Sequence, residues 1–326
     1  MILAFVLALG SFAFAETQSQ TQKDIPLRNL DTLIVNHTLG SLEIRGWALD
    51  KIRVQMTKRT LSADETSAQP VFESMDVLVE ETRGNVELTS YIGRGLDIVE
   101  KLKLRKSSDY HMNLVLFVPA RLVLMVSAAQ GEIKIQDMKN NIEVRGGTLP
   151  IELKDIRAGE VSVACDSCSL KVKKVTALLR LIAGNNAVEL ESVSSGKLYA
   201  QTTAGHITAR NITGHQLYVT ETGDIRGQGL KGRVEFKTQS GQIVVNRLSG
   251  FLSGLSEKGN IRADILKWDF MDKAFIESHQ GNIDIKLPKD FQGEVDFNAA
   301  KGKIDLGFPL HAAVKPDRAQ KSGEWM

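Results

Sequence analysis

The sequence predicts an all-β protein of the β-solenoid class, in which short strands stack in successive coils of the chain. Three observations lead to this prediction: a glycine every nine residues, apolar residues at fixed places after alternate glycines, and apolar–polar alternation between them. Such alternation is typical of short strands, and a fixed internal period is typical of repeat folds. The period is set by Gly196, Gly205, Gly214, Gly223, Gly232, Gly241, Gly250 and Gly259.

Every second glycine closes a repeat of eighteen residues that forms one two-strand coil. A short strand can bury its apolar side only against the same strand of the next coil, about 4.8 Å away, so like residues should form inward rows. One expected row runs Ile207, Ile225, Ile243, Ile261, Ile283 and Ile304, and a second runs Ile212, Leu230, Leu248 and Leu266. The expected inward pairs of the second halves are Leu198 and Ala200, Val234 and Phe236, and a shifted Leu217 and Val219.

The glycines are interpreted as corners between strands. A helical interpretation fails, because each glycine in a helix interior costs about 1 kcal/mol. At a corner, glycine is required where the backbone takes a positive φ or where a side chain has no room.

The regular solenoid is expected over residues 131–309, with nine or ten coils and a length of roughly 45 Å. Residues 28–130 also alternate but lack the eighteen-residue period. We interpret them as irregular strand-rich first coils that cap the solenoid, since end coils must be closed off from edge-to-edge pairing. Within this part, LSADETSAQP and residues 93–110 are expected to be loops.

The two ends of the chain differ from the repeat. Residues 1–15 are apolar and finish in Ala13-Phe14-Ala15, which predicts a signal peptide, although no Lys or Arg precedes the apolar run. A polar linker is expected over 16–27 and a disordered tail over 310–326. The signal peptide predicts export to the periplasm or the cell surface.

Three stretches carry a resemblance to a known family: FVPARLVLMVSAAQGEIKIQDM, the run of G-x-I and G-x-V turns, and LPKDFQGEVDFNAAKGKIDLGFP. They resemble the bacterial putative-adhesin family of unknown function, and TLGSLEIRGW is similar to the opening coil of that family. The resemblance covers about residues 30–309. It implies an exported β-helix protein of the cell envelope, and its motifs determine the fold without assigning any functional residue.

Glycine-rich turns bind calcium when aspartates recur in consecutive repeats. Here Asp224 alone directly follows one of the periodic glycines, and Gln242 stands one coil away. We therefore expect neither a metal site nor a cofactor.

The two cysteines, Cys165 and Cys168, form a C-x-x-C motif that follows a predicted strand and falls at a solenoid corner. Redox pairs of this spacing sit at the N-terminus of a helix. A structural disulfide or two buried thiols is therefore the favoured interpretation. Redox activity and a metal pair are weaker alternatives, the latter because structural zinc takes four ligands.

Hydroxyl residues recur three positions before alternate glycines, at Thr202, Thr220, Thr238, Ser256 and Ser278. Stacked hydroxyls can form a carbohydrate- or ice-binding ladder, but they more often bond to corner carbonyls of their own chain. We favour the second role.

Catalytic residues are not evident in the sequence. Glycosidases need two carboxylates, and no expected outward row assembles two; Asp264 and Asp284 are the positions at which such chemistry would be sought. His206 and His215 are nine residues apart, so they should lie on different sheets. We expect no enzymatic activity.

The composition favours no charged partner, since the net charge is +2 and the one basic run, EKLKLRKSS at 100–108, lacks interleaved aromatics. We expect no nucleic-acid partner and no stable membrane insertion. The sequence favours an exported, non-enzymatic, adhesin-like scaffold whose extended sheet faces bind a glycan or an envelope protein. The alternatives are a polysaccharide-active β-helix lyase or hydrolase, and an envelope-stress or signalling accessory. Exposed end coils would also allow a homodimer.

Overall fold

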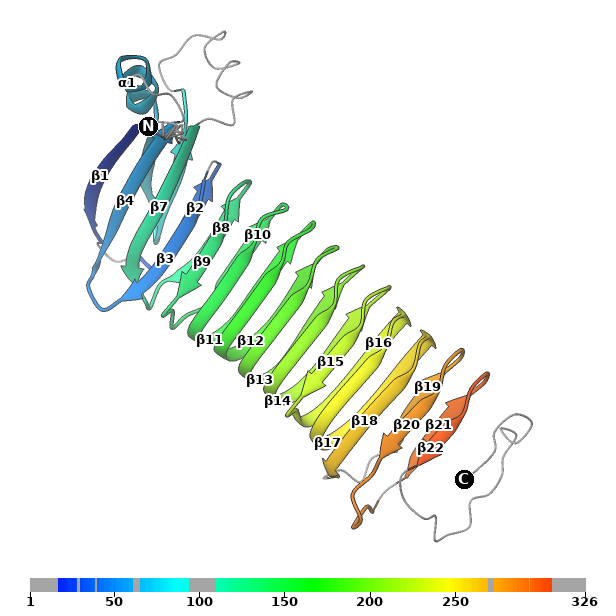
Figure 1. Ribbon diagram of the computed structural model, residues 1–326. Helices are drawn as coiled ribbons and strands as arrows, with labels where there is room; N and C mark the ends of the chain where they lie inside the picture. Colours follow the sequence, from blue (N-terminus) through cyan, green and yellow to red (C-terminus); the bar gives the residue numbers. More distant parts are fainter. Residues whose placement is uncertain are drawn as a thin grey trace, which may run out of the picture.

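The structure, a computed structural model, describes residues 17–27, 30–38, 40–60, 65–93, 110–268, 273–292 and 294–306. It is a rod of stacked coils, with the first strands at one end and β22 at the other (Figure 1). The predicted all-β solenoid is confirmed, with about nine turns of about 19 residues each. The expected signal peptide at 1–15, the basic run at 100–108 and the tail at 310–326 lie outside the described residues.

Each coil contributes one arm to a ladder of parallel strands that we call ladder A and one arm to a second, ladder B. Five long strands bend from ladder A into ladder B: β11 (Ile151–Cys165), β12 (Leu170–Ala183), β13 (Val188–Thr202), β14 (Ile207–Thr220) and β17 (Ile243–Lys258). Shorter strands of ladder A are β9 (Ile133–Gln136), β15 (Ile225–Gln228), β18 (Ile261–Lys267), β20 (Ile283–Lys286) and β22 (Ile304–Leu306). Shorter strands of ladder B are β8 (Val123–Ala128), β10 (Ile142–Gly146), β16 (Lys231–Ser240), β19 (Ala274–Ser278) and β21 (Val295–Ala299).

The first inward row is confirmed, because the six predicted isoleucines pair in register from Ile207 to Ile304. The five from Ile207 to Ile283 are at most 1% exposed. Such stacking buries each apolar side chain against its neighbours in the coils on either side, which stabilises the rod by the hydrophobic effect.

In the second inward row, the last inward residue differs by one position from the prediction. Ile212, Leu230 and Leu248 are buried as expected, but Leu266 is 50% exposed, and Ile265 takes its place in the core at 2%. The register shifts here, so that Leu248 pairs with Ile265. Arg247 supplies an extra bend residue with a positive φ before Leu248, and the coil of Ile265 has no such residue, so its inward position falls one place earlier.

The predicted shift in the second half of β14 is wrong. Gln216 and Tyr218 point into the core, where they pair with Leu198 and Ala200 of the neighbouring strand β13. Leu217 and Val219 point outward. The buried Gln216 Nε2 donates to the carbonyl of Lys231 at 3.0 Å, and Tyr218 Oη donates to Gln216 Oε1 at 2.8 Å. These hydrogen bonds permit two polar side chains inside the core, which alternation alone does not predict.

The chain returns from ladder B to ladder A at what we call the turn corner. A Cβ atom on Gly241 would overlap the carbonyl oxygen of Gly223 one coil earlier, and the same relation repeats along the column. Because these φ angles lie outside the left-handed region, lack of room alone requires glycine. The column consists of Gly205, Gly223, Gly241, Gly259, Gly281 and Gly302.

The chain passes from ladder A to ladder B at what we call the bend corner. Here Gly250 combines both predicted reasons for glycine, since its φ is +143° and a Cβ atom would overlap the carbonyl of Gly232. Three residues before this position, most coils have a left-handed residue that is usually not glycine. These residues, with φ between 52° and 65°, are Asp137, Asp155, Lys174, Ser192, Asn211, Gly229 and Arg247.

The N-terminal end of the rod is not sequential. The first coil, β2 (Thr32–His37) and β3 (Leu42–Trp47), is inserted between β6 (Asn85–Tyr91) and β8 in ladder B and between β7 (Tyr110–Pro119) and β9 in ladder A. Antiparallel strands then close the end: β4 (Lys51–Thr60) on β7, β5 (Asp76–Thr82) on β6, and β1 (Thr17–Pro26) on β4. This arrangement covers the open edges of the first coils.

Two expectations for this part do not hold. The polar segment 16–27, expected as a linker, forms β1 over Thr17–Pro26, because its backbone completes the edge of β4 along the whole strand. The expected loop LSADETSAQP is partly helical, since α1 spans Glu65–Ser74. Phe72 and Met75 are buried at the end of this helix, which accounts for its place against the cap.

Candidate functional site

Face A, the outward side of ladder A from β3 to β20, is polar along its length. Its first row alternates in charge at directly opposed positions on neighbouring strands: Glu43, Lys134, Glu152, Lys171 and Glu189. The row continues through Thr208, Arg226, Val244, Arg262 and Asp284. Its second row is Arg45, Gln136, Lys154, Lys173, Glu191, Arg210, Gln228 and Asn246.

Ion pairs order several side chains of face A. Lys173 Nζ lies 3.1 Å from Glu191 Oε2, and Arg262 Nε lies 3.4 Å from Asp284 Oδ2. Such exposed pairs contribute only about 0–1 kcal/mol each. Face A is therefore a regular array of charged and amide groups whose ion pairs add little to the stability of the rod.

Face B, the outward side of ladder B, has an apolar centre. Ile182, Tyr199, Leu217 and Val219 lie outward on three neighbouring strands, and Leu178 beside them is 48% exposed. The guanidinium of Arg180 lies over the ring of Tyr199, with its Cζ 5.7 Å from the ring centroid. This patch was not predicted from the sequence, because Leu217 and Val219, which form half of it, were expected to point into the core.

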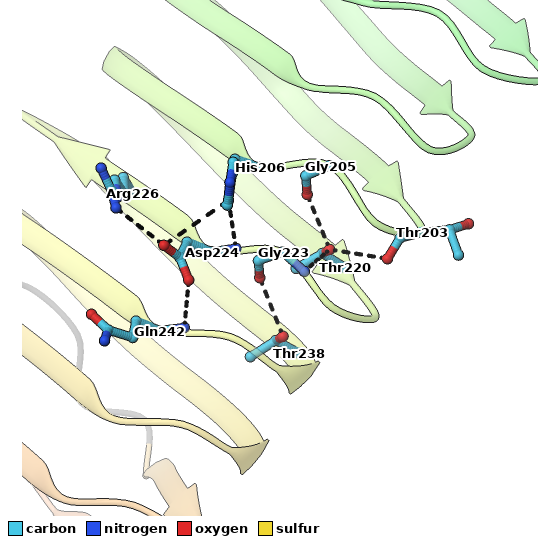
Figure 2. Close-up of polar contacts among 9 residues, drawn as sticks. All are labelled: Thr203, Gly205, His206, Thr220, Gly223, Asp224, Arg226, Thr238 and Gln242. Atoms are coloured by element: carbon cyan, nitrogen blue, oxygen red, sulfur yellow. Dashed lines mark hydrogen bonds and ion pairs between the residues drawn. The ribbon is translucent and has the colours of Figure 1, made fainter.

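The turn corner places His206, Asp224 and Gln242 in one column, each directly after a glycine (Figure 2). His206 Nδ1 accepts a hydrogen bond from the backbone N–H of Asp224 at 3.0 Å, and Asp224 Oδ1 accepts one from Gln242 N–H at 2.9 Å. The bond from Gln242 lowers the pKa of the Asp224 carboxyl, helped by Arg226. Asn260 and Asn282 continue the pattern. The column links one coil to the next, which gives Asp224 a structural role.

The hydroxyl column bonds to the turn corner as favoured from the sequence. Thr202 Oγ1 donates to the carbonyl of Gly184 at 2.8 Å and accepts from Gly205 N–H at 3.1 Å. Thr220 Oγ1 and Ser278 Oγ likewise donate to glycine carbonyls (Figure 2 for Thr220). These hydroxyls are at most 4% exposed, so they are not a ligand-binding ladder.

Cys165 lies in the same column and Cys168 lies three residues further into the corner. The structure joins their sulfur atoms as a disulfide, with Cα atoms 5.8 Å apart, and Cys168 is fully buried. The bond closes one turn corner at the place where later coils use a threonine. This position favours the structural interpretation of the pair.

The candidate catalytic residues are arranged as follows. Asp264 is directly opposite Lys286, and Asp284 is directly opposite Arg262, so the two carboxylates occupy diagonal positions on β18 and β20. Diagonal positions in a sheet are about 7–8 Å apart. That these two aspartates lie near each other was not predicted from the sequence, because they belong to different outward rows. His206 and His215 are separate: His206 is near Asp224, and His215 Nε2 is 3.2 Å from Glu235 Oε1 on the other side of the coil.

A cavity of about 390 Å³ lies in the N-terminal cap, between β1, β4 and β5. Its lining includes Val54, Met56 and Met75, together with Lys58, whose pKa is lowered by burial. It is at the opposite end of the rod from Asp264 and Asp284. Among the described residues, no three His, Cys, Asp or Glu side chains are placed to hold a metal ion, and no helix is long and apolar enough to cross a membrane.

These features define a β-solenoid with a polar face, a partly apolar face and hydrogen-bonded corners. The model of the Toastrack family, DUF4097, matches residues 108–324, two thirds of the chain. The chain therefore belongs to the Toastrack family. No curated protein matches the chain.

Several solved structures match most of the chain at low sequence identity. A "putative adhesin" from Parabacteroides merdae is 13% identical, with 88% of this chain and 95% of that chain covered and a TM-score of 0.42. A "putative adhesin" from Bacteroides fragilis is 11% identical, with 88% and 97% covered and a TM-score of 0.34. A "putative lipid binding protein" from Parabacteroides distasonis is 10% identical, with 88% and 96% covered and a TM-score of 0.25. We draw no functional argument from similarity at this level.

Proposed function

We propose that this chain is an exported, non-enzymatic scaffold that binds a glycan or another envelope protein through face A. The observation that carries the proposal is the pair of outward rows on face A, which are polar from β3 to β20 except at Val244. Rows of this kind offer hydrogen-bonding and charged groups at the strand spacing of about 4.8 Å. A long ligand would be held by many weak contacts along a rigid surface, as in other repeat proteins.

Two features support export to the periplasm or the cell surface. The first is the apolar segment that ends in Ala13-Phe14-Ala15, which has the form of a signal-peptidase site. The second is the disulfide between Cys165 and Cys168, since structural disulfides persist mainly in oxidising compartments.

The proposal is tested by capture from envelope extract and by a glycan array. The test variant is Lys171→Gln/Glu189→Gln, which removes two opposed charges at the middle of face A without adding net charge. The matched control is Glu221→Gln/Lys258→Gln, which removes an exposed acid after β14 and an exposed base at the end of β17. We expect the native chain and the control to retain the same ligand, and the face A variant to lose at least tenfold in retention. Equal retention by both variants would reject face A as the binding surface.

A second candidate, a polysaccharide-active enzyme, is favoured by the diagonal placement of Asp264 and Asp284. Retaining glycosidases hold their carboxyl groups about 5–5.5 Å apart and inverting enzymes about 6.5–9.5 Å. Each aspartate here stands opposite a cation, Lys286 or Arg262, which suits an ion pair better than an acid that must give up a proton. Turnover of a polysaccharide by the native chain, lost in Asp264→Asn and in Asp284→Asn, would establish the enzyme and replace the scaffold.

A further inference from the structure

Face B carries charge on both sides of its apolar centre. In the outward row that contains Tyr199 and Leu217, the next residue toward the N-terminal end is Arg180, and the next toward the C-terminal end is Glu235. In the parallel row, Arg145 lies toward the N-terminal end and Glu277 toward the C-terminal end. Arg180 and Arg145 thus lie on one side of the apolar centre, and Glu235 and Glu277 lie at the matching distances on the other. Glu143, two residues from Arg145, and Lys237, next to Val219, depart from this order.

This order makes face B complementary to itself. Consider two copies of the chain related by a two-fold axis that runs along the strands and passes between β13 and β14. The coils of the second copy then run in the opposite order, and each outward row faces the same row of the second copy. Tyr199 then meets Leu217 of the second copy, and Arg180 meets Glu235 of the second copy. In the other row, Arg145 meets Glu277 of the second copy.

We propose that face B is the interface of a homodimer, in which two rods pack face to face and run antiparallel. The partner is a second copy of this chain because Arg180 and Arg145 of one copy meet Glu235 and Glu277 of the other. At the centre, Tyr199 Oη already donates to Gln201 Oε1, and the outward Leu217 and Val219 on the neighbouring strand are apolar. Glu235 is held in place by Arg233 at 3.1 Å and His215 at 3.2 Å, so its carboxylate is already positioned at the surface.

The size of the surface fits a dimer. The strands from Arg145 to Glu277 extend over about 38 Å at the usual strand spacing, and the outward arms are about 16 Å long. The interface would bury roughly 600 Å² on each copy, or about 1,200 Å² in total, which is the lower end of the range for specific interfaces.

The surface is tested by sedimentation equilibrium of the purified chain over a range of concentrations. Leu217→Lys places a charge at the centre of face B, and Thr208→Lys places the same charge on face A of the same strand, β14. We expect the native chain and Thr208→Lys to dimerise, and Leu217→Lys to bind itself at least a hundredfold more weakly. A native chain that stays monomeric, or a Leu217→Lys variant that dimerises like the native chain, overturns the proposal; the latter result would indicate pairing through the end coils.

The antiparallel register is tested by charge reversal. Arg180→Glu alone and Glu235→Arg alone should each be monomeric, because like charges then face each other at both ends of the apolar patch. An equal mixture of the two variants should form a heterodimer, since every charged pair in it is of opposite sign. Circular dichroism of each variant confirms that it is folded. A mixture that stays monomeric overturns the antiparallel arrangement. Because these measurements use the purified chain alone, they can fail while the proposed binding through face A stands.

Discussion

The corners and the faces of this rod are under different physical constraints. At the turn corner, Gly241 has no space for even a methyl group, and Thr202 bonds to two backbone groups of the same corner. On the faces, side chains as different as Lys171, Thr208 and Val244 occupy one outward row. The corners therefore specify the fold, whereas the outward positions of the faces accept very different side chains.

The largest effect is expected from a methyl group at the turn corner. In Gly241→Ala the new Cβ would overlap the carbonyl oxygen of Gly223, so the coil must shift, at a cost of at least about 3 kcal/mol. Gly254→Ala in β17 is the matched control, because no atom lies within 4 Å of the position of its Cβ. Urea unfolding followed by circular dichroism measures both variants. Equal stability of the two would contradict the crowded corner.

A buried histidine at the first turn corner should make the protein sensitive to acid. His37 lies in the same column as Cys165, bonds to Ser90 Oγ at 2.9 Å, and burial lowers its pKa from 6.5 to about 4. Above pH 6.5 the residue is neutral in both states. As pH falls from 6.5 to 4, the unfolded chain binds a proton that the folded chain does not, which lowers the free energy of unfolding by on the order of 3 kcal/mol.

The control for this pH effect is His279, which lies at the surface between Glu257 and Glu277. The bond to Glu257, and then that to Glu277, raises the pKa of His279. Its stabilising effect is therefore present below pH 6.5 and disappears as pH rises through the raised value. Urea midpoints between pH 4 and 7 should lose most of their acid-induced fall in His37→Gln, whereas His279→Gln should make that fall steeper. The same pH profile in His37→Gln and the native chain would show that His37 is not the acid-sensitive group.

An intermediate effect is expected from removing a corner hydroxyl. Thr202→Val leaves the carbonyl of Gly184 and the N–H of Gly205 without this partner, which costs about 1–3 kcal/mol. Thr208→Val on face A is the matched control and should change stability by less than about 0.5 kcal/mol. Differential unfolding of the two variants distinguishes these results; a similar loss in both would mean that the hydroxyl bonds contribute nothing specific.

The smallest effect on stability is expected from face A. Lys171→Gln/Glu189→Gln removes one opposed pair at the surface, which should change the free energy of unfolding by less than about 1 kcal/mol. Its effect on ligand capture should nevertheless be large. A loss of stability comparable to that of Thr202→Val would show that face A also holds the fold.

The parts of the fold that could be predicted are those in which a residue type is required. Glycine at the turn corner and isoleucine along the inner row leave a period in the sequence, so the solenoid and the row from Ile207 to Ile304 were predictable. The bend corner was not, because residues as different as Asp155, Lys174 and Arg247 share one left-handed conformation. Each costs roughly 1–2 kcal/mol, so the surrounding coils impose it and the local sequence does not reveal it.

The faces were predictable only in part. The polar character of face A follows from alternation, but the apolar patch of face B depends on Gln216 and Tyr218 pointing inward. That orientation rests on a hydrogen bond from Gln216 to the carbonyl of Lys231 and on one from Tyr218 to the Gln216 side chain. The first of these joins two strands and cannot be inferred from one strand. The diagonal placement of Asp264 and Asp284 likewise depends on the register between β18 and β20.

The division between corners and faces is tested most directly by comparing ligand capture per folded molecule in two variants. Thr238→Val changes a buried hydroxyl at the turn corner, and Lys171→Gln/Glu189→Gln changes face A. We predict that the corner variant is less stable but captures the envelope ligand as well as the native chain at a temperature at which it is folded. The face A variant should be as stable as the native chain and lose at least tenfold in capture. Full capture by the face A variant, with loss of capture by the folded corner variant, would show that ligand binding depends on the corners and not on face A.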